Sequence, residues 1–287
     1  MRLGEGWLDY ELIDTSAGRR LERWGDYLLI RPDPQVIWKS EEKHEGWREA
    51  DAVYHRALKG GGSWEFKRSL PAEWTVSWGG ELELFVTPTG FKHTGVFPEQ
   101  AANWRLYREL IAAARREVRV LNLFGYTGAA SLVCLKAGAS VCHVDASKGM
   151  VALAKRNASL NSLESAPIRY IVDDCLKFVR REARRGRRYE AIIMDPPSYG
   201  RGPSGELWRL EDNIFELVCE CRALLSEKPL FFALNSYTTG LAPSAAGCVV
   251  AEALKELKPT IRSDEIGLPV SESGLALPCG ATSLATF

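Results

Sequence analysis

Three short segments place glycines, carboxylates and a proline-rich loop directly after apolar runs. The segments are VRVLNLFGYTG at Val118–Gly128, HVDAS at His143–Ser147 and IIMDPPSYG at Ile192–Gly200. Gly125 and Gly128 bracket a tight turn, and glycine lets a ligand approach the main chain closely. Asp145 follows about 20 positions later, the spacing of a carboxylate that accepts hydrogen bonds from a ribose. The pattern predicts a nucleotide-like cofactor at the ends of parallel strands, although the glycines alone also suit an ordinary βαβ turn.

The composition of the first turn bears on which cofactor it serves. A dinucleotide fold favours G-x-G-x-x-G, and a phosphate loop favours G-x-x-x-x-G-K-[ST]. The turn Asn122–Gly128 has two glycines and an aromatic residue, so it matches neither pattern. A turn that need not cradle phosphates suits S-adenosylmethionine, whose polar end is an amino acid. NAD and FAD are disfavoured by the missing third glycine but not excluded.

A third apolar run, Ile168–Val172, ends at two carboxylates, Asp173 and Asp174. One of them could accept a hydrogen bond from an adenine amino group. The alternative is an N-cap, because aspartate is a preferred capping residue and favours a helix N-terminus electrostatically. Adjacent aspartates allow one cap and one ligand contact, and we assign the ligand contact to Asp174.

The loop after Ile192–Met194 carries the predicted chemistry. Pro196 and Pro197 fix two φ angles and remove two donors, so the loop is expected to be rigid with carbonyls open to hydrogen bonds. Asp195 and the Pro196 carbonyl could hold an exocyclic amine, and Tyr199 could stack on a base. Stacking of a base on an aromatic side chain is worth about 1–3 kcal/mol. The alternative is a stiff strand–helix connection with a capping aspartate.

Five motifs, taken in order along the chain, resemble those of the class I S-adenosylmethionine-dependent methyltransferases. They are GVFPEQAANW, VLNLFGYTGAAS, HVDAS, VDDCLKF and MDPPSYGRG. The group in question contains the large-subunit ribosomal RNA cytosine-C5 and guanine-N7 methyltransferases, and the resemblance covers about residues 80–287. It implies that Asp195, Pro196, Pro197 and Tyr199 line the transfer site. It also implies a set of cofactor-binding residues along the strand ends: Phe97, Gln100, Asn122, Phe124, Gly125, Tyr126, Thr127, Gly128, Asp145, Ala146, Ser147, Asp173, Asp174 and Cys175.

One departure argues against cytosine-C5 methylation, which needs an activated cysteine to attack C6. The group places this cysteine either after the DPP prolines or at the end of the fifth strand. Here these places hold Ser198 and Ser236-Tyr237-Thr238. Direct in-line transfer to a nitrogen remains, which needs alignment and a suitable electrostatic setting. Arg201, Asn235, Ser236 and Tyr237 are the predicted substrate residues, although the last three could only terminate the strand.

Alternation of strands and helices predicts a doubly wound, Rossmann-like seven-stranded sheet in residues 81–287. Strands are expected near 118–123, 140–145, 168–172, 190–194 and 229–235, with two late strands near 260–266 and 282–287. Residues 1–80 read as a small β-rich domain that could present substrate. In this domain Val36–Trp38 is expected to form a strand, and Glu65–Arg68 to form a hairpin with Thr75–Trp78. Seven of the nine tryptophans lie there, more in keeping with a core than with a base-stacking face.

Composition frames the remaining expectations. The 287 residues are 46% hydrophobic and 26% charged, without a long apolar run, so a globular chain with no membrane span is expected. Seven cysteines without metal-ligand spacing are typical of a protein in the reducing cytosol, and no metal site is expected. The zero net charge disfavours a general nucleic-acid binder, but Arg180–Arg188 is locally basic. We predict a cytoplasmic methyltransferase that acts at a base nitrogen of structured RNA, with ribosomal RNA as the expected substrate. The alternatives are a nicotinamide-dependent oxidoreductase and a catalytically silent, S-adenosylmethionine-binding RNA-binding protein.

Overall fold

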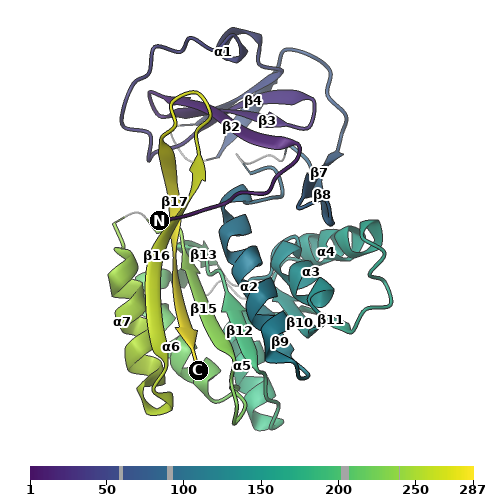
Figure 1. Cartoon of the computed structure of the whole chain (residues 1–287), viewed down its shortest axis with the longest axis vertical. Coiled ribbons are helices and arrows are strands. Elements are labelled where there is room, and N and C mark those ends of the chain that lie inside the picture. The colour runs from purple at the N-terminus through teal and green to yellow at the C-terminus, as the bar shows by residue number, and fades with distance from the viewer. Residues whose placement is uncertain (58–60, 89–92, 202–206, 239) are drawn as a thin grey trace. The chain divides into compact units, whose positions relative to one another are not determined.

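The computed structural model describes residues 1–57, 61–88, 93–201, 207–238 and 240–287. The chain divides into two compact units (Figure 1). The first comprises Met1–Ala102 and Ile266–Cys279, and the second comprises Asn103–Glu265 and Gly280–Phe287. The first unit therefore extends past residue 80 and includes a segment close to the C-terminus.

The first unit is built on a five-stranded sheet of order β2-β3-β4-β5-β6, antiparallel except where β4 meets β5. A two-stranded hairpin, β7-β8, follows it in sequence. A short helix, α1 (Gly46–Glu49), precedes β5. The strands are β1 (Arg2–Leu3), β2 (Tyr10–Ser16), β3 (Arg19–Trp24), β4 (Tyr27–Pro32), β5 (Ala52–Arg56), β6 (Gly62–Phe66), β7 (Trp74–Trp78) and β8 (Leu82–Val86).

Buried tryptophans and one charged cluster hold the first unit together. Trp24 is completely buried, and Tyr10 packs on it with ring centroids 4.5 Å apart. Glu22, also completely buried, binds Arg31 through contacts of 2.6 and 2.7 Å and accepts a hydrogen bond from the Tyr10 hydroxyl. Burial opposes the charge of Glu22, but the cations Arg20 and Arg31 and the Tyr10 hydroxyl together lower its pKa. A buried carboxylate is tolerated because its charge is paired and hydrogen-bonded.

The second unit contains the order β16-β17-β15-β12-β9-β10-β11. Pairs from β15 to β11 are parallel, and β17 is antiparallel to β15. The short β1 adds an eighth strand beside the part of β16 that belongs to the first unit. The strands are β9 (Arg119–Leu123), β10 (Ser140–Asp145), β11 (Ile168–Val172), β12 (Ala191–Met194), β15 (Phe231–Ser236), β16 (Thr260–Pro269) and β17 (Ala276–Thr286). A two-stranded hairpin of β13 (Tyr199–Arg201) and β14 (Leu207–Arg209) follows β12.

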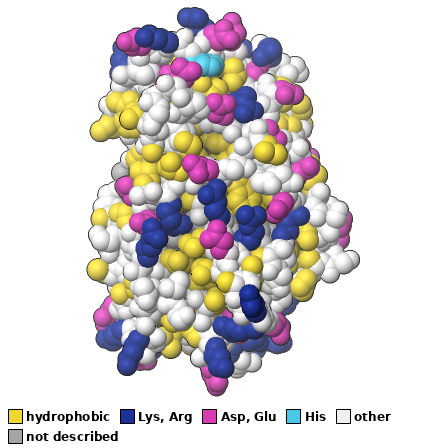
Figure 2. Space-filling model, viewed as in Figure 1, with side chains coloured by type: hydrophobic (Ala, Val, Ile, Leu, Met, Phe, Trp, Pro, Cys, Tyr) yellow, Lys and Arg dark blue, Asp and Glu magenta, His cyan; other side chains and the backbone are white. Residues whose placement is uncertain are grey.

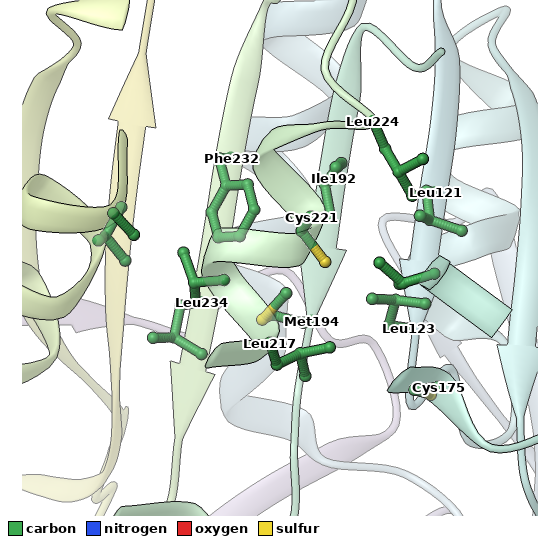
Figure 3. Packing of buried hydrophobic residues seen from close by; sticks show 14 of the residues in the cluster. Leu121, Leu123, Cys175, Ile192, Met194, Leu217, Cys221, Leu224, Phe232 and Leu234 are labelled. Carbon is green, nitrogen blue, oxygen red and sulfur yellow. The ribbon is translucent and has the colours of Figure 1, made fainter. Parts of the chain in front are cut away.

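Helices cover both faces of this sheet, as Figure 1 shows. Alternate strand residues point to opposite faces, and the central strands are buried on both, mostly through apolar side chains. One face packs on α5, α6 and α7, and Figure 3 shows Leu121, Met194 and Phe232 of that core. The helices are η1 (Pro98–Gln100), α2 (Ala101–Ala114), α3 (Ala129–Lys136), α4 (Lys148–Leu160), α5 (Cys175–Arg184), α6 (Leu210–Arg222), α7 (Pro243–Leu254) and η2 (Lys255–Leu257).

The predicted Rossmann-like sheet with an N-terminal β-rich region is confirmed, but two predictions inside that region are wrong. β6 pairs with β5, and β7 pairs with β8, so residues 65–68 and 75–78 do not form a hairpin. Pro71 interrupts the connection between β6 and β7, whereas the positive φ angles of Gly79 and Gly80 make a tight turn to β8. Val36–Trp38 is not a strand either: its backbone closes a loop by bonding to Ala17 and Gly18.

Candidate S-adenosylmethionine site

Four neighbouring strands of the second unit end in register. Leu123 of β9 pairs with Val144 of β10 on one side and with Met194 of β12 on the other. The next pair outward joins Asp145 of β10 to Val172 of β11. Strand order reverses between β9 and β12, which is the point where open parallel sheets bind ligands. The sequence-predicted residues that follow these four strands therefore meet at one edge of the sheet.

The turn after β9 has an unusual backbone. Phe124 and Tyr126 adopt positive φ angles of 55° and 51°, and Gly128 adopts 91°. Left-handed backbone at a bulky residue costs on the order of 1–3 kcal/mol and concentrates at functional sites. The turn is tied to β10, because the Gly125 amide donates to the Val144 carbonyl at 2.9 Å. This bond fixes the turn on β10.

A buried polar trio lies beneath this turn. Asn122 donates to Ser131 at 2.9 Å, and the Ser131 hydroxyl lies 3.0 Å from His143 Nδ1. A Cβ at Gly125 would lie 2.4 Å from the imidazole, so only glycine fits over the ring. Burial lowers the pKa of His143 to about 4, because the protonated ring is disfavoured away from water. Asn122 is thus placed under the turn. The sequence analysis quoted His143 within the HVDAS motif but assigned it no role, because only the fold brings its ring against Gly125.

Asp145 is fixed by two backbone donors. Its Oδ2 accepts from the Tyr126 amide at 2.9 Å, and its Oδ1 accepts from the Ser147 amide at 2.8 Å. Its side chain remains half-buried, while Ala146 and Ser147 are exposed. Ser147 also caps α4, accepting from the Met150 amide. A carboxylate held by two amides is oriented before ligand arrives, which suits recognition of ribose hydroxyls.

Thr127 and Gly128 join the turn to α3 and α4. Thr127 is buried, and its carbonyl accepts from the Asn157 amide group at 2.8 Å. Gly128 lies so close to Ala154 that an added Cβ would be 2.9 Å from the Cβ of Ala154. These two residues therefore set the distance between the turn and α4.

The three residues after β11 have separate structural duties. Asp173 forms an ion pair with Arg181 and accepts from the Asp174 amide. Asp174 is the N-cap of α5, accepting from the Lys177 amide at 2.9 Å. Both carboxylates are half-buried at the sheet edge. Cys175 is buried against the Phe124 backbone, and burial raises the pKa of its thiol, so the thiolate is disfavoured there.

The DPPSY loop is cross-braced on several sides. The indole N–H of Trp208 donates to the Pro197 carbonyl at 2.6 Å, so that carbonyl is not open as expected from the sequence. Thr238 donates to the Ser198 hydroxyl at 2.7 Å. Asp195 is half-buried and Pro196 is buried at the start of the loop. The loop is therefore rigid through these contacts as well as through its prolines.

Trp208 is a site residue that the sequence analysis missed. Its ring centroid lies 5.7 Å from that of Phe124, so it joins the β9 turn to the DPPSY loop. In the β13-β14 hairpin, Trp208 opposes Gly200, whereas Tyr199 opposes Arg209. Adjacent strand residues point to opposite faces, so Tyr199, which is 57% exposed, faces away from Trp208. The side chain of Arg201 lies outside the described part of the chain.

The predicted substrate residues on β15 differ in exposure. Asn235 is buried, and its side-chain oxygen accepts from Asn103 at 3.0 Å and from Thr282 at 2.8 Å. Ser236 is buried and accepts from the Thr238 amide at 3.2 Å. Tyr237 is half-buried and follows the strand. The contacts of Asn235 hold β15 to α2 and β17.

Phe97 and Gln100 belong to the first unit. Phe97 immediately precedes η1, and its ring centroid lies 5.1 Å from that of His93. Gln100 is the last residue of η1 and is buried. Its backbone amide donates to the Phe97 carbonyl at 3.0 Å. The two residues are therefore close to one another within that unit.

The basic run Arg180–Arg188 is partly neutralised. Arg180 pairs with Glu216 and Glu220, and Arg185 pairs with the buried Glu182. On the face seen in Figure 2, acidic side chains lie among the basic ones.

Among the described residues, no group of three or more His, Cys, Asp or Glu side chains is arranged to hold a metal ion. None of the described helices is both long and apolar enough to cross a membrane.

Comparison with known proteins identifies the family. The family model of S-adenosylmethionine-dependent methyltransferases matches residues 73–225, including all four strand ends. A methyltransferase of this type from Agrobacterium tumefaciens is 38% identical in sequence, with a TM-score of 0.93 over 99% of this chain and 92% of that one. A putative methyltransferase from Streptococcus mutans shares the fold at 19% identity, with a TM-score of 0.77 over 99% of this chain and 76% of that one.

Curated relatives include the ribosomal RNA large subunit methyltransferase K/L of Shewanella sp. strain ANA-3, 31% identical over 199 residues, or 67% of this chain. The corresponding protein of Shewanella baltica strain OS155 is 34% identical over 224 residues, or 72% of this chain. The chain spans only about a quarter of these relatives, 24% and 27% of their lengths. The chain belongs to the S-adenosylmethionine-dependent methyltransferase family and is distantly related to the ribosomal RNA large subunit methyltransferases K/L.

Proposed function

We propose that this enzyme methylates a base nitrogen of ribosomal RNA by direct in-line transfer, without a covalent cysteine intermediate. The observation that carries the proposal is the position of the braced DPPSY loop immediately beside the β9 turn, in register through Met194 and Leu123. S-adenosylmethionine supplies an electrophilic methyl group on a sulfonium. The protein must hold the acceptor nitrogen in line with that group and keep its lone pair available.

The residues of the loop support amine recognition. Asp195 follows β12 directly, and neither Pro196 nor Pro197 has an N–H donor, so the backbone of these two residues can only accept hydrogen bonds. A carboxylate and a carbonyl together accept two hydrogen bonds, which matches an exocyclic amino group. In our proposal Asp195 orients this amine, and the Thr238–Ser198 and Trp208–Pro197 contacts keep the loop still.

Cysteine placement supports transfer without a covalent intermediate. Ser198 and Ser236–Thr238 occupy the two positions where a nucleophilic thiol would be expected. Cys175 is buried against the Phe124 backbone of the β9 turn, but its raised pKa and its burial make it a poor nucleophile. All seven cysteines are free thiols, which supports a reducing cytosolic location. RNA as the acceptor also agrees with the name of the K/L relatives, ribosomal RNA large subunit methyltransferases, of which this chain matches a part.

The test incubates the full chain with methyl-labelled S-adenosylmethionine and unmodified large-subunit ribosomal RNA. Total protein and small metabolites serve as parallel acceptors. Label mapped to a base nitrogen supports the proposal, and Asp195→Ala should remove it while cofactor binding stays within about threefold. Label at cytosine carbon 5 contradicts the cysteine argument. Label only in protein or metabolites contradicts the RNA acceptor, and full activity of Asp195→Ala contradicts the role of the loop. Cofactor binding without label in any acceptor favours the catalytically silent alternative.

A further inference from the structure

The edge strand of the first unit carries a row of aromatic rings that runs from the core to the surface. Trp64 and Phe66 of β6 lie on one face of the sheet, and their rings are stacked with centroids 6.3 Å apart and planes at 28°. Tyr54 of β5 opposes Trp64 and meets it edge-on at 5.4 Å. Tyr54 is buried, whereas Phe66 is 52% exposed. We name these three residues the aromatic row.

A hollow of about 360 Å³ lies at the exposed end of this row. Phe66, Arg68, Ser69, Leu70, Pro71 and Pro88 contribute to its lining. Its volume falls within the range of about 300–1,000 Å³ typical of small-molecule pockets. Two of its lining residues are prolines with fixed φ angles, so part of its wall is rigid before any ligand arrives.

One cationic side chain, Arg68, lines the hollow, and a second, Lys67, directly precedes it in sequence. Arg68, whose side chain is 68% exposed, is anchored by an ion pair with the buried Asp51. Lys67 is exposed and donates to the Arg48 carbonyl at 3.2 Å. The strand's own carboxylate, Glu65, points to the opposite face, where it contacts His55 at 2.7 Å. An aromatic surface with adjoining cations is thus separated from the acidic side chain of the same strand.

We propose that the hollow beside the aromatic row binds an unpaired base of RNA. The base stacks on Phe66, and the phosphates of the same strand contact Lys67 and Arg68. The inference rests on the proposed function and names a surface of the first unit that binds the RNA acceptor. Every base has a π-face, and stacking platforms beside positive charge are a general means of binding single strands.

The charges favour RNA over two other occupants of an aromatic surface. An apolar peptide would use Phe66 and Leu70 but would offer no anionic group to Lys67 or to the exposed part of Arg68. A second copy of this chain, related by two-fold symmetry, would bring Lys67 and Arg68 towards their own counterparts. An unpaired nucleotide satisfies the ring and the cations together.

The test measures binding of fluorescent single-stranded RNA oligonucleotides, oligo-uridine and oligo-adenine, to the full chain without cofactor. Phe66→Ala should weaken binding by about 5- to 150-fold, the effect of losing one stacked base. Phe66→Trp should restore it. Ile37→Ala is the matched control, because Ile37 is an apolar side chain of the same unit with 92% exposure outside the hollow. This control should change binding less than twofold.

A second variant tests the phosphate contacts. Lys67→Gln should make the plot of log affinity against log salt concentration less steep by about 0.7, the contribution of one phosphate contact on a single strand. Equal effects of Phe66→Ala and Ile37→Ala, or none from either, would overturn the proposal. A light-scattering dimer that Phe66→Ala dissociates would identify a second copy as the occupant instead. Oligonucleotide binding is measured without methyl transfer, so it can succeed or fail independently of the proposed function.

Discussion

Replacing Gly125 by alanine tests how the β9 turn is supported. The added Cβ would lie 2.4 Å from Cε1 and 2.5 Å from Nδ1 of His143. Ordinary contacts begin near 3.4 Å, so either the imidazole or the turn must move by about 1 Å. The ring is a rigid group buried on all sides, so it cannot rotate away as a flexible side chain would.

The cost follows from what each movement breaks. Overpacking of a filled core costs about 1–3 kcal/mol. Moving the ring also stretches its 3.0 Å contact with Ser131, and a lost hydrogen bond adds about 1 kcal/mol. We therefore expect Gly125→Ala to lower the free energy of unfolding by about 2–4 kcal/mol. If the turn moves instead, the Tyr126–Asp145 contact lengthens, and the Kd for S-adenosylmethionine should rise at least tenfold.

Chemical denaturation and calorimetric titration with S-adenosylmethionine measure the two effects. Gly149→Ala is the control: Gly149 lies in α4, and its added Cβ would meet Ser147 at an unstrained 3.8 Å. Alanine should stabilise this helix by up to about 1 kcal/mol. The double variant Gly125→Ala/His143→Ala then removes the clash, so it should recover at least 1 kcal/mol relative to the sum of the single effects.

Two results would refute this reasoning. The first is a Gly125→Ala protein as stable as the wild type with unchanged cofactor affinity. The second is additivity of the two substitutions within about 0.5 kcal/mol, which is typical of residues that do not touch. Either result would mean that Gly125 serves the backbone conformation alone.

Three further predictions concern other contacts. Because the pKa of His143 is lowered from 6.5 to about 4, the folded ring stays neutral while the unfolded one gains a proton, so stability should fall by up to about 3 kcal/mol between pH 6.5 and 4. His143→Gln should remove this loss of stability, as measured by unfolding curves recorded across that pH range. An equal dependence of stability on pH in the variant and the wild type would contradict the prediction. Trp208→Phe keeps the ring but removes the donor to the Pro197 carbonyl, so kcat should fall about 5- to 10-fold with cofactor Kd within twofold, as measured by steady-state kinetics and titration. Glu22→Gln leaves the buried Arg31 without its counter-ion and should cost about 3–5 kcal/mol, seen as faster amide hydrogen exchange in β3 and β4.

Residues whose physics is local could be predicted from the sequence. Apolar runs of five or six residues flanked by polar ones gave β9, β10 and β11 nearly to the residue, because a short apolar run bounded by polar residues is typical of a strand. Asp174 illustrates the limit of such reasoning. The sequence analysis gave Asp174 the ligand contact rather than the cap. The structure shows that Asp174 is the cap of α5, while its ligand contact stays a prediction.

Strand pairing in the first unit was less predictable, because it depends on partners distant in sequence. β6 could pair with either neighbour along the chain, and its alternation of side chains alone does not distinguish β5 from β7. Trp208 was missed for a similar reason. Its role depends on β13 and β14 folding back towards Phe124, a contact between segments more than 80 residues apart.

The trio beneath the β9 turn explains why the strained backbone persists. Phe124 and Tyr126 would gain stability by leaving the left-handed region, so something must oppose that relaxation. Bonds from the Gly125 and Tyr126 amides to β10 hold the turn from above, and the His143 ring fills the space below it. Relaxing either φ angle would break one of these bonds or open a void. The turn is thus held in shape before the cofactor arrives, so binding energy is not spent on ordering it.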